Sequence, residues 1–306
     1  MIIIENLTKK FGEITAVEGL TFQVEEGEIF GFLGPNGAGK TTTVRMLCCL
    51  ISKTSGEATI DNYDISKSVD SLQIRRMIGL VPDNVGLYED LTAFENLDFY
   101  GKLYEVPEGR RRENIERFLK MLDMWGRKDT RTGTFSKGMK QKLALARALV
   151  HEPKILFMDE PTANLDPESS KTVRDFILEI KKQGRTIFLN THNLDEAQRV
   201  CDRIGIIKTK LLTIGTPEQL RESLSKPKTE IRLAQVRDGM HTALSKLIPN
   251  KIEVSNNKLL IDMTDPDKEN PAIIAAITSI GGQIQGVTQL VSTLEDVYLQ
   301  IVKETK

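Results

Sequence analysis

The sequence predicts an α/β fold in which a parallel β-sheet core, an antiparallel β layer and a helical subdomain are followed by a small α+β domain. Two observations carry this prediction. Short apolar strand patterns alternate with helical patterns along much of the chain, and a glycine-rich loop follows one of these strands and opens a helix. The length of 306 residues agrees with two domains, for which we expect bounds of 1–225 and 226–306.

The larger domain begins with strands and continues with helices. Three apolar stretches are expected to form an antiparallel layer beside the glycine-rich loop, and the segment from about 84 to 150 has a mostly helical pattern. The three expected strands are Ile2–Leu7, Thr21–Val24 and Ile29–Leu33.

Strands and helices alternate in the rest of the larger domain. This alternation is typical of a parallel sheet with helices packed on it. The expected strands are Lys154–Asp159, Thr186–Asn190 and Asp202–Ile207.

The segment 226–306 has the strand–helix–strand–strand–helix–strand order of a ferredoxin-like domain, followed by a last helix. Asn270 is expected to cap its second helix, and Ser292 with Glu295 has the spacing of a capping box at the last one. We see no catalytic constellation here. We therefore predict a regulatory or dimerisation role, with a small-molecule sensor site as the alternative.

Charge and hydropathy restrict the choice of partners. Forty-two basic and forty-three acidic residues leave a net charge of −1, which argues against a nucleic-acid partner bound by a broad basic face. No apolar run reaches the ~18 residues of a membrane span, and the first residues lack the basic-then-apolar order of a signal peptide. We expect a cytosolic chain whose membrane role comes through a partner.

The glycine-rich loop is a predicted phosphate site. Residues Gly34 to Thr41 fit the pattern G-x-x-x-x-G-K-[ST] in full, between an apolar strand and a helix. Glycines let backbone N–H groups surround phosphate oxygens, Lys40 can reach the β- and γ-phosphates, and Thr41 offers a hydroxyl to Mg²⁺. The predicted phosphate-binding residues are Gly34, Pro35, Asn36, Gly37, Ala38, Gly39, Lys40, Thr41 and Thr42.

Two carboxylates follow the later apolar strand "KILFMDEPT". Asp159 and Glu160 stand at its carboxyl end, where open α/β sheets bind their ligands. Asp159 can hold Mg²⁺, and Glu160 is free to polarise a water for attack on the γ-phosphate. An exposed strand end would explain such a pair by itself, but behind a complete phosphate loop the pair predicts hydrolysis.

The chain resembles the nucleotide-binding subunit of ATP-binding cassette (ABC) transporters over about residues 2–225, because all the motifs of that family occur in their usual order. The resemblance implies a P-loop NTPase fold with ATP and Mg²⁺ as cofactors. The closing "STLEDVYLQI" is similar to the C-terminal extension of drug-exporter-type subunits. The further matching segments are "LTKKFGEITAV", "IGLVPDNVGLYEDLTAFENL" (78–97), "FSKGMKQ", "ANLDP" (163–167) and "LNTHNLDEA" (189–197).

The resemblance also implies roles for individual residues. Glu160 corresponds to the catalytic base, His192 to a γ-phosphate contact, and Phe11 to the aromatic that stacks on adenine, although Phe11 alone would suit a hydrophobic core equally well. Asp83 stands where the family usually has a glutamine that approaches the metal-bound water. Because aspartate is shorter and anionic, this departure weakens the metal assignment.

The signature segment "FSKGMKQ" departs from the stricter pattern at Lys137 and Met139, but keeps Ser136 and Gly138. In the family these two positions face the γ-phosphate bound by the partner subunit. The resemblance therefore implies an ATP-dependent head-to-tail dimer of two copies, with Ser136 and Gly138 completing the partner's site.

Three functions are compatible with this sequence. The leading one is an ATPase subunit on the inner face of the membrane that powers export through a separate integral-membrane permease. A soluble ABC-type ATPase acting on nucleic acid or ribosomes is the second, although no duplicated cassette or basic extension is present. A non-hydrolysing nucleotide-gated module is the third, and intact Lys40, Asp159 and Glu160 argue against it.

Overall fold

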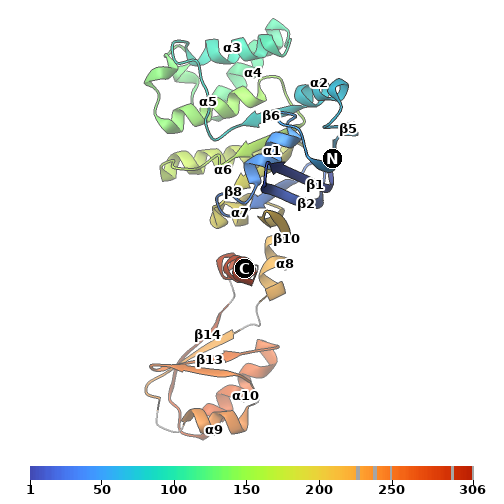
Figure 1. Cartoon of the computed structure of the whole chain (residues 1–306). Coiled ribbons are helices and arrows are strands. Elements are labelled where there is room, and N and C mark those ends of the chain that lie inside the picture. Colours follow the sequence, from blue (N-terminus) through green and yellow to red (C-terminus); the bar gives the residue numbers. More distant parts are fainter. Residues whose placement is uncertain (225–227, 237–239, 249, 291–292, 305–306) are drawn as a thin grey trace. The chain divides into compact units, whose positions relative to one another are not determined.

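The computed structural model describes residues 1–224, 228–236, 240–248, 250–290 and 293–304 (Figure 1). Its contacts divide the chain into two compact units, Met1–Pro217 and Glu218–Lys306. This division falls at the start of helix α8 (Pro217–Leu224), ahead of the bound at residue 225 expected from the sequence.

The first unit contains an antiparallel four-stranded sheet in the order β2-β1-β4-β5. Strand β1 lies between β2 and β4, so that Ile2 stands opposite both Val24 and Ile60. All three of these side chains are fully buried, and they form one face of the core. The strands are β1 (Ile2–Phe11), β2 (Ile14–Val24), β4 (Ser55–Ile60) and β5 (Tyr63–Asp64).

The second sheet of this unit has six strands in the order β10-β9-β3-β8-β7-β6. All pairs are parallel except β10 with β9, which is antiparallel. The strands are β3 (Ile29–Leu33), β6 (Ile78–Val81), β7 (Ile155–Asp159), β8 (Thr186–Thr191), β9 (Arg203–Lys208) and β10 (Lys210–Gly215).

The expectation that Ile29–Leu33 joins the antiparallel layer is wrong. This strand, β3, is parallel to β8 on one side and to β9 on the other, and every residue in it is buried. The five apolar or glycine residues of β3 suit the interior of a parallel sheet, whose strands are buried on both faces. Helix α1 (Lys40–Leu47) follows the glycine-rich loop after β3 and leads to β4 in the antiparallel sheet.

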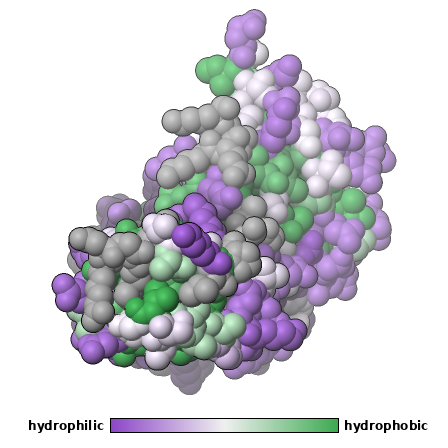
Figure 2. Space-filling view, turned by 90° about the horizontal axis from the view of Figure 1, so that it is seen from below, coloured by the Kyte–Doolittle hydropathy of each residue, from purple (hydrophilic) through white to green (hydrophobic). Residues whose placement is uncertain are grey.

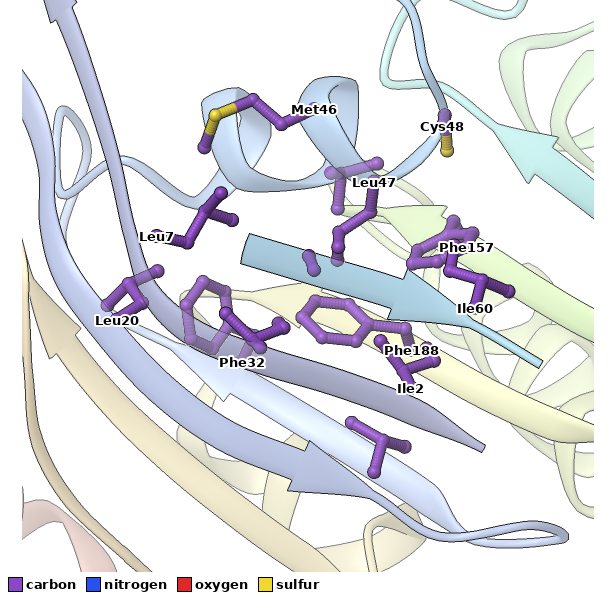
Figure 3. Close-up of a cluster of buried hydrophobic side chains, with 14 of the residues drawn as sticks. Ile2, Leu7, Leu20, Phe32, Met46, Leu47, Cys48, Ile60, Phe157 and Phe188 are labelled. Carbon is purple, nitrogen blue, oxygen red and sulfur yellow. The ribbon is translucent and has the colours of Figure 1, made fainter. Parts of the chain in front are cut away.

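The two sheets of the first unit share one hydrophobic core (Figure 3). Phe32 of β3 and Phe188 of β8 pack with ring centroids 5.3 Å apart, and Ile2 from β1 and Leu47 from α1 join the same cluster. Burying one such side chain contributes ~1.5–3 kcal/mol. The core therefore fixes the strand before the glycine-rich loop and the helix after it.

Helices occupy the segment 84–150, as the sequence predicts. Helix α3 (Ala93–Leu103) begins with a capping box between Thr92 and Glu95 and packs with α4 (Glu108–Met121) and α5 (Lys137–Leu149). The other helices of the first unit are α2 (Ser68–Met77), α6 (Pro167–Lys182), α7 (Leu194–Val200) and two short 3₁₀ turns, η1 (Trp125–Arg127) and η2 (Thr132–Thr134).

The second unit contains an antiparallel sheet in the order β12-β13-β11-β14, and its elements follow the predicted order. Ile231 from the sheet, Leu244 from α9 and Ile277 from α10 lie in its buried core. On the face seen in Figure 2, hydrophobic and hydrophilic side chains are interspersed. The elements are β11 (Lys228–Leu233), α9 (Met240–Leu247), β12 (Ile252–Ser255), β13 (Lys258–Asp262), α10 (Pro266–Ser279), β14 (Ile284–Leu290) and α11 (Leu294–Glu304).

The cap predicted for α10 is wrong. Asp265 caps α10 by accepting from the Lys268 N–H, so that Asn270 lies inside the helix, and Pro266 takes the first helical position that suits proline. The capping box of α11 joins Thr293 to Asp296, because each side chain accepts from the other's backbone N–H at 3.2 and 2.9 Å. Ser292 lies outside the described residues.

Candidate functional site

The loop that follows β3 has a backbone shaped by its glycines. A Cβ at Gly34 would lie 2.4 Å from the carbonyl oxygen of Ile207, and one at Gly39 would lie 2.4 Å from that of Ala16. Gly37 and Gly39 also have φ angles of 81° and 98°, which favour glycine. Gly39 ends the loop as the N-cap of α1 and has no side chain to cover the first N–H groups, so the helix start is open to an anion.

This loop forms the wall of a cavity of about 250 Å³. The carboxyl end of β7 contributes its two carboxylates to the same cavity, and the segment after β6 contributes Asp83. Segments far apart in the chain meet here because β3, β7 and β6 run parallel in one sheet. The lining residues are Ala16, Pro35, Asn36, Gly37, Ala38, Gly39, Lys40, Thr41, Thr42, Asp83, Asp159 and Glu160.

Lys40 places a buried ammonium group at the wall of the cavity. Its Nζ donates to the carbonyl oxygens of Gly34 at 2.7 Å and Pro35 at 3.2 Å, and lies 3.8 Å from Oε1 of Glu160. Burial lowers the pKa of Lys40, while the charges of Glu160 and Asp159 oppose that shift. The two carboxylates therefore favour the cationic form, which phosphate binding requires.

Thr41 and Asp159 are in direct contact. The hydroxyl of Thr41 donates to Oδ2 of Asp159 at 2.7 Å, and Nδ2 of Asn190 donates to Oδ1 at 3.2 Å. The predicted metal-binding groups are thus brought together as hydroxyl and carboxylate oxygens, which are the ligands that Mg²⁺ prefers. Asp83 lines the same cavity but is exposed.

Glu160 and His192 also lie together. Nδ1 of His192 is 2.8 Å from Oε1 of Glu160, and the backbone N–H of His192 donates to Oε2 at 3.4 Å. Glu160 has a φ angle of 52°, unusual for a residue with a side chain, and its own N–H donates to the carbonyl oxygen of Asn190 at 3.0 Å. The strained backbone turns this carboxylate from β7 toward the end of β8.

Ser136, Gly138 and Phe11 lie elsewhere. Ser136 caps α5 by accepting from the Met139 N–H at 3.3 Å, and Gly138 lies against Ser169 at the start of α6. Phe11 is 51% exposed at the end of β1, so the core alternative for it is wrong. None of the three is among the described residues that line the phosphate cavity.

Two residues of the site were not predicted from the sequence. Ala16 lines the cavity as a small apolar residue on β2, and nothing in its sequence context marks it. Asn190 has a clearer signal, because it is a polar residue at the carboxyl end of the apolar stretch "TIFLN". Polar side chains at that edge of a parallel sheet are candidates for ligand contacts.

The fold and the site together define the class of protein. A buried parallel strand runs into a glycine loop and a helix whose first residues are Lys40 and Thr41, and two carboxylates stand at the carboxyl end of β7 in the same sheet. This is the construction of a P-loop nucleoside-triphosphate-binding protein.

Comparison with known proteins identifies the family of P-loop proteins to which the chain belongs. Residues 17–163 match the family model described as ABC transporter. The chain is 32% identical over 310 residues to the linearmycin resistance ATP-binding protein LnrL of Bacillus subtilis (strain 168), covering 100% of this chain and 99% of that one. It is 30% identical over 309 residues to the daunorubicin resistance ATP-binding protein DrrA3 of Streptomyces coeruleorubidus, covering 100% and 96%.

A solved structure of an ATP-binding cassette is also similar to this chain. A dimeric structure of the ATP-binding cassette MJ0796, in a post-hydrolysis state bound to ADP and Pi, has a TM-score of 0.64 and 29% identity, covering 71% of this chain and 98% of that one. The chain therefore belongs to the ATP-binding subunits of ABC transporters, among relatives of the antibiotic-resistance and export type. Among the residues that the structure describes, no helix is long and apolar enough to cross a membrane.

Proposed function

We propose that this chain binds ATP with Mg²⁺ and hydrolyses it at the inner face of the cell membrane. There it powers export through a separate integral-membrane permease. The observation that carries hydrolysis is the 2.8 Å contact between His192 and Glu160, with Glu160 in the wall of the phosphate cavity. The antibiotic-resistance names of the full-length relatives support export over a role with nucleic acid or ribosomes.

The phosphate loop holds the triphosphate. Residues 34–42 direct backbone N–H groups at the phosphate oxygens, and Lys40 adds a positive charge beside the γ-phosphate. Thr41 and Asp159 would hold Mg²⁺, with Asp83 as a further oxygen donor at the edge of the cavity. When bound, Mg²⁺ neutralises charge that develops on the phosphate oxygens.

Glu160 acts as the general base. Its carboxylate accepts a proton from the water that attacks the γ-phosphate, and His192 keeps that carboxylate oriented and contacts the γ-phosphate. Removing a positioned base costs ~10²–10⁴-fold in rate. The exposed ring of Phe11 would stack on the adenine.

Two copies build each complete site. Ser136 and Gly138 lie at the N-terminus of α5, away from the chain's own phosphate cavity, and there they would cap the γ-phosphate held by the partner copy. The dimeric MJ0796 structure supports this arrangement. The region 1–225 acts as the cassette, and 226–306 acts as a regulatory or dimerisation domain.

The test is phosphate release by the purified full chain with ATP and Mg²⁺. We expect turnover in the wild type and a loss of about 10²–10⁴-fold in Glu160→Gln. Glu57→Gln, which changes an exposed carboxylate on β4, is the control and should keep wild-type turnover. Equal rates in Glu160→Gln and wild type would refute the assigned base.

Export is tested by isolating the tagged chain from cell membranes. We expect an integral-membrane protein to co-purify, and the ATPase rate of the pair to fall in Glu160→Gln. Recovery of ribosomal particles in place of a membrane protein would contradict the export role.

A further inference from the structure

A buried carboxylate lies behind the Glu160–His192 pair. Glu196 on α7 is 1% exposed, and each of its two oxygens accepts a hydrogen bond from a threonine hydroxyl. Oε1 accepts from Oγ1 of Thr162 at 2.7 Å, and Oε2 accepts from Oγ1 of Thr191 at 2.8 Å. Both threonines are buried as well.

The two threonines belong to different catalytic segments. Thr162 lies two residues after Glu160, in the turn that follows β7, and Thr191 directly precedes His192 at the end of β8. One carboxylate therefore ties the segment that carries Glu160 to the segment that carries His192. At 2.7 and 2.8 Å, both bonds have the usual length of a well-formed O–H···O hydrogen bond.

The network closes on itself through Asn193. Its backbone N–H donates to Oγ1 of Thr191 at 3.0 Å, and its side-chain oxygen accepts from the backbone N–H of Glu196 at 3.1 Å as the cap of α7. The start of α7, the residues on both sides of His192 and the turn after Glu160 are thus held as one unit.

The hydrogen bonds of this network can stabilise the strained backbone of Glu160. Its φ angle of 52° lies in a region that costs a residue with a side chain free energy, so the conformation persists only where neighbouring contacts fix it. Burial raises the pKa of the Glu196 carboxyl, while the hydroxyls of Thr162 and Thr191 lower it. The two hydroxyl bonds therefore partly offset the effect of burial on this carboxyl.

We propose that Glu196 is a positioning residue for ATP hydrolysis, which acts by holding the segments of Glu160 and His192 at their contact distance. This inference rests on the proposed function. It goes beyond that function because Glu196 is not among the described residues that line the phosphate cavity.

The direct test is Glu196→Gln in the full chain. Glutamine keeps the size of the side chain and one acceptor oxygen, but its amide nitrogen cannot accept from the second hydroxyl. Because a misplaced base costs up to ~10²-fold, we expect kcat to fall by about 10- to 100-fold. The dissociation constant for ATP should stay within about twofold, since the phosphate loop is not in this network.

The threonines provide matched variants. Thr162→Val and Thr191→Val keep the shape but remove the hydroxyl, and should each lower kcat, whereas Thr162→Ser and Thr191→Ser keep the hydroxyl and should retain it. Glu28→Gln is the control for a buried carboxylate elsewhere, because Glu28 pairs with Arg203 and lies ahead of β3 at the opposite end of the sheet. It should leave kcat unchanged.

A second measurement does not depend on hydrolysis. The chain has three histidines, and His192→Gln identifies the ¹H–¹³C NMR signal of the His192 ring. Glu160→Gln should shift that signal strongly in the wild-type background and more weakly in the Glu196→Gln background.

The outcomes separate the two proposals. If the wild type releases no phosphate, the proposed function fails, and the NMR comparison still decides the role of Glu196. An equal shift in both backgrounds, unchanged kcat in Glu196→Gln, or a parallel loss of kcat and ATP affinity would each overturn the positioning role.

Discussion

His192 contacts Glu160 through two of its atoms, because its ring nitrogen Nδ1 lies 2.8 Å from Oε1 and its backbone N–H donates to Oε2 at 3.4 Å. Both carboxylate oxygens are therefore oriented by one residue from the neighbouring strand. The ring of His192 is about half exposed, whereas the Glu160 side chain is mostly buried. The pair thus combines a fixed carboxylate in the wall of the cavity with a ring that is open to solvent.

Lys40→Ala should weaken ATP binding. The substitution removes the buried ammonium at the wall of the phosphate cavity, and a hydrogen bond to a charged group contributes about 1.5–3 kcal/mol. We expect the dissociation constant to rise by about 10- to 100-fold in equilibrium binding measurements. Lys210→Ala, which changes an exposed lysine paired with Glu18, is the control. Unchanged affinity in Lys40→Ala would remove the phosphate-site assignment.

Glu160→Gln should accumulate as a dimer with ATP and Mg²⁺. The phosphate contacts remain while the proposed base is lost, so the γ-phosphate proposed to join two copies should persist. Adding Ser136→Arg should return the protein to monomer, because the larger side chain occupies the cap over that phosphate. Ser68→Arg, on the exposed start of α2, should leave the dimer intact.

Light scattering after size-exclusion chromatography measures this change in mass. The comparison is repeated on residues 1–225, so that a dimer held by the second unit is recognised. A truncated Glu160→Gln that stays monomeric at saturating ATP would contradict a site shared by two copies of this chain.

Gly138→Ala should destabilise the chain through packing. A Cβ at this position would lie 2.5 Å from Oγ and 3.0 Å from Cβ of Ser169, so the start of α5 must move away from α6. Overpacking of this kind costs about 1–3 kcal/mol. In urea unfolding, Ser169→Gly should reduce the cost of Gly138→Ala, because it removes both close atoms. Equal costs in the two backgrounds would show that this contact does not require the glycine.

His151 should make the fold sensitive to acid. Burial lowers the pKa of His151 from its ordinary 6.5 to about 4, and its ring stacks on Tyr104 at 3.7 Å. Because the unfolded chain binds the proton at higher pH than the folded chain, stability falls as the pH drops from about 6.5 toward 4. The expected loss between pH 7 and pH 5 is about 2 kcal/mol.

Urea unfolding at these two pH values tests this expectation. His151→Phe keeps a flat ring against Tyr104 and should reduce the pH dependence by about that amount. His192→Gln, which changes an exposed histidine, should retain it. A pH dependence that is the same in His151→Phe and wild type would contradict the assignment.

The sequence predicted the phosphate loop because its chemistry is local. The spacing of Gly34, Gly39 and Lys40 is set within one turn between a strand and a helix, so a short pattern contains it. Sheet membership is not local. Ile29–Leu33 reads as a short apolar strand in either layer, and only its distant partners β8 and β9 identify the parallel sheet.

Residues that lie behind the site, outside the lining of the phosphate cavity, were the hardest to predict. Glu196 stands in a short helix among other charged residues, and its burial follows from tertiary contacts with Thr162 and Thr191. The prediction for Ser136 and Gly138 has a different difficulty. Their helix start is fully formed within one chain, but the phosphate that they are proposed to cap belongs to another.

The position of β3 also sets an order for synthesis. Its neighbours in the sheet are β8 and β9, which end at Lys208, whereas the next strands made after it pair with other partners. A growing chain leaves the ribosome from its N-terminus, so the residues of the phosphate loop emerge long before the strands that hold them. Closing so long a loop is slow, and premature contacts have time to form. We therefore expect the nascent chain to gain nucleotide affinity late, once β9 has emerged to pair with β3.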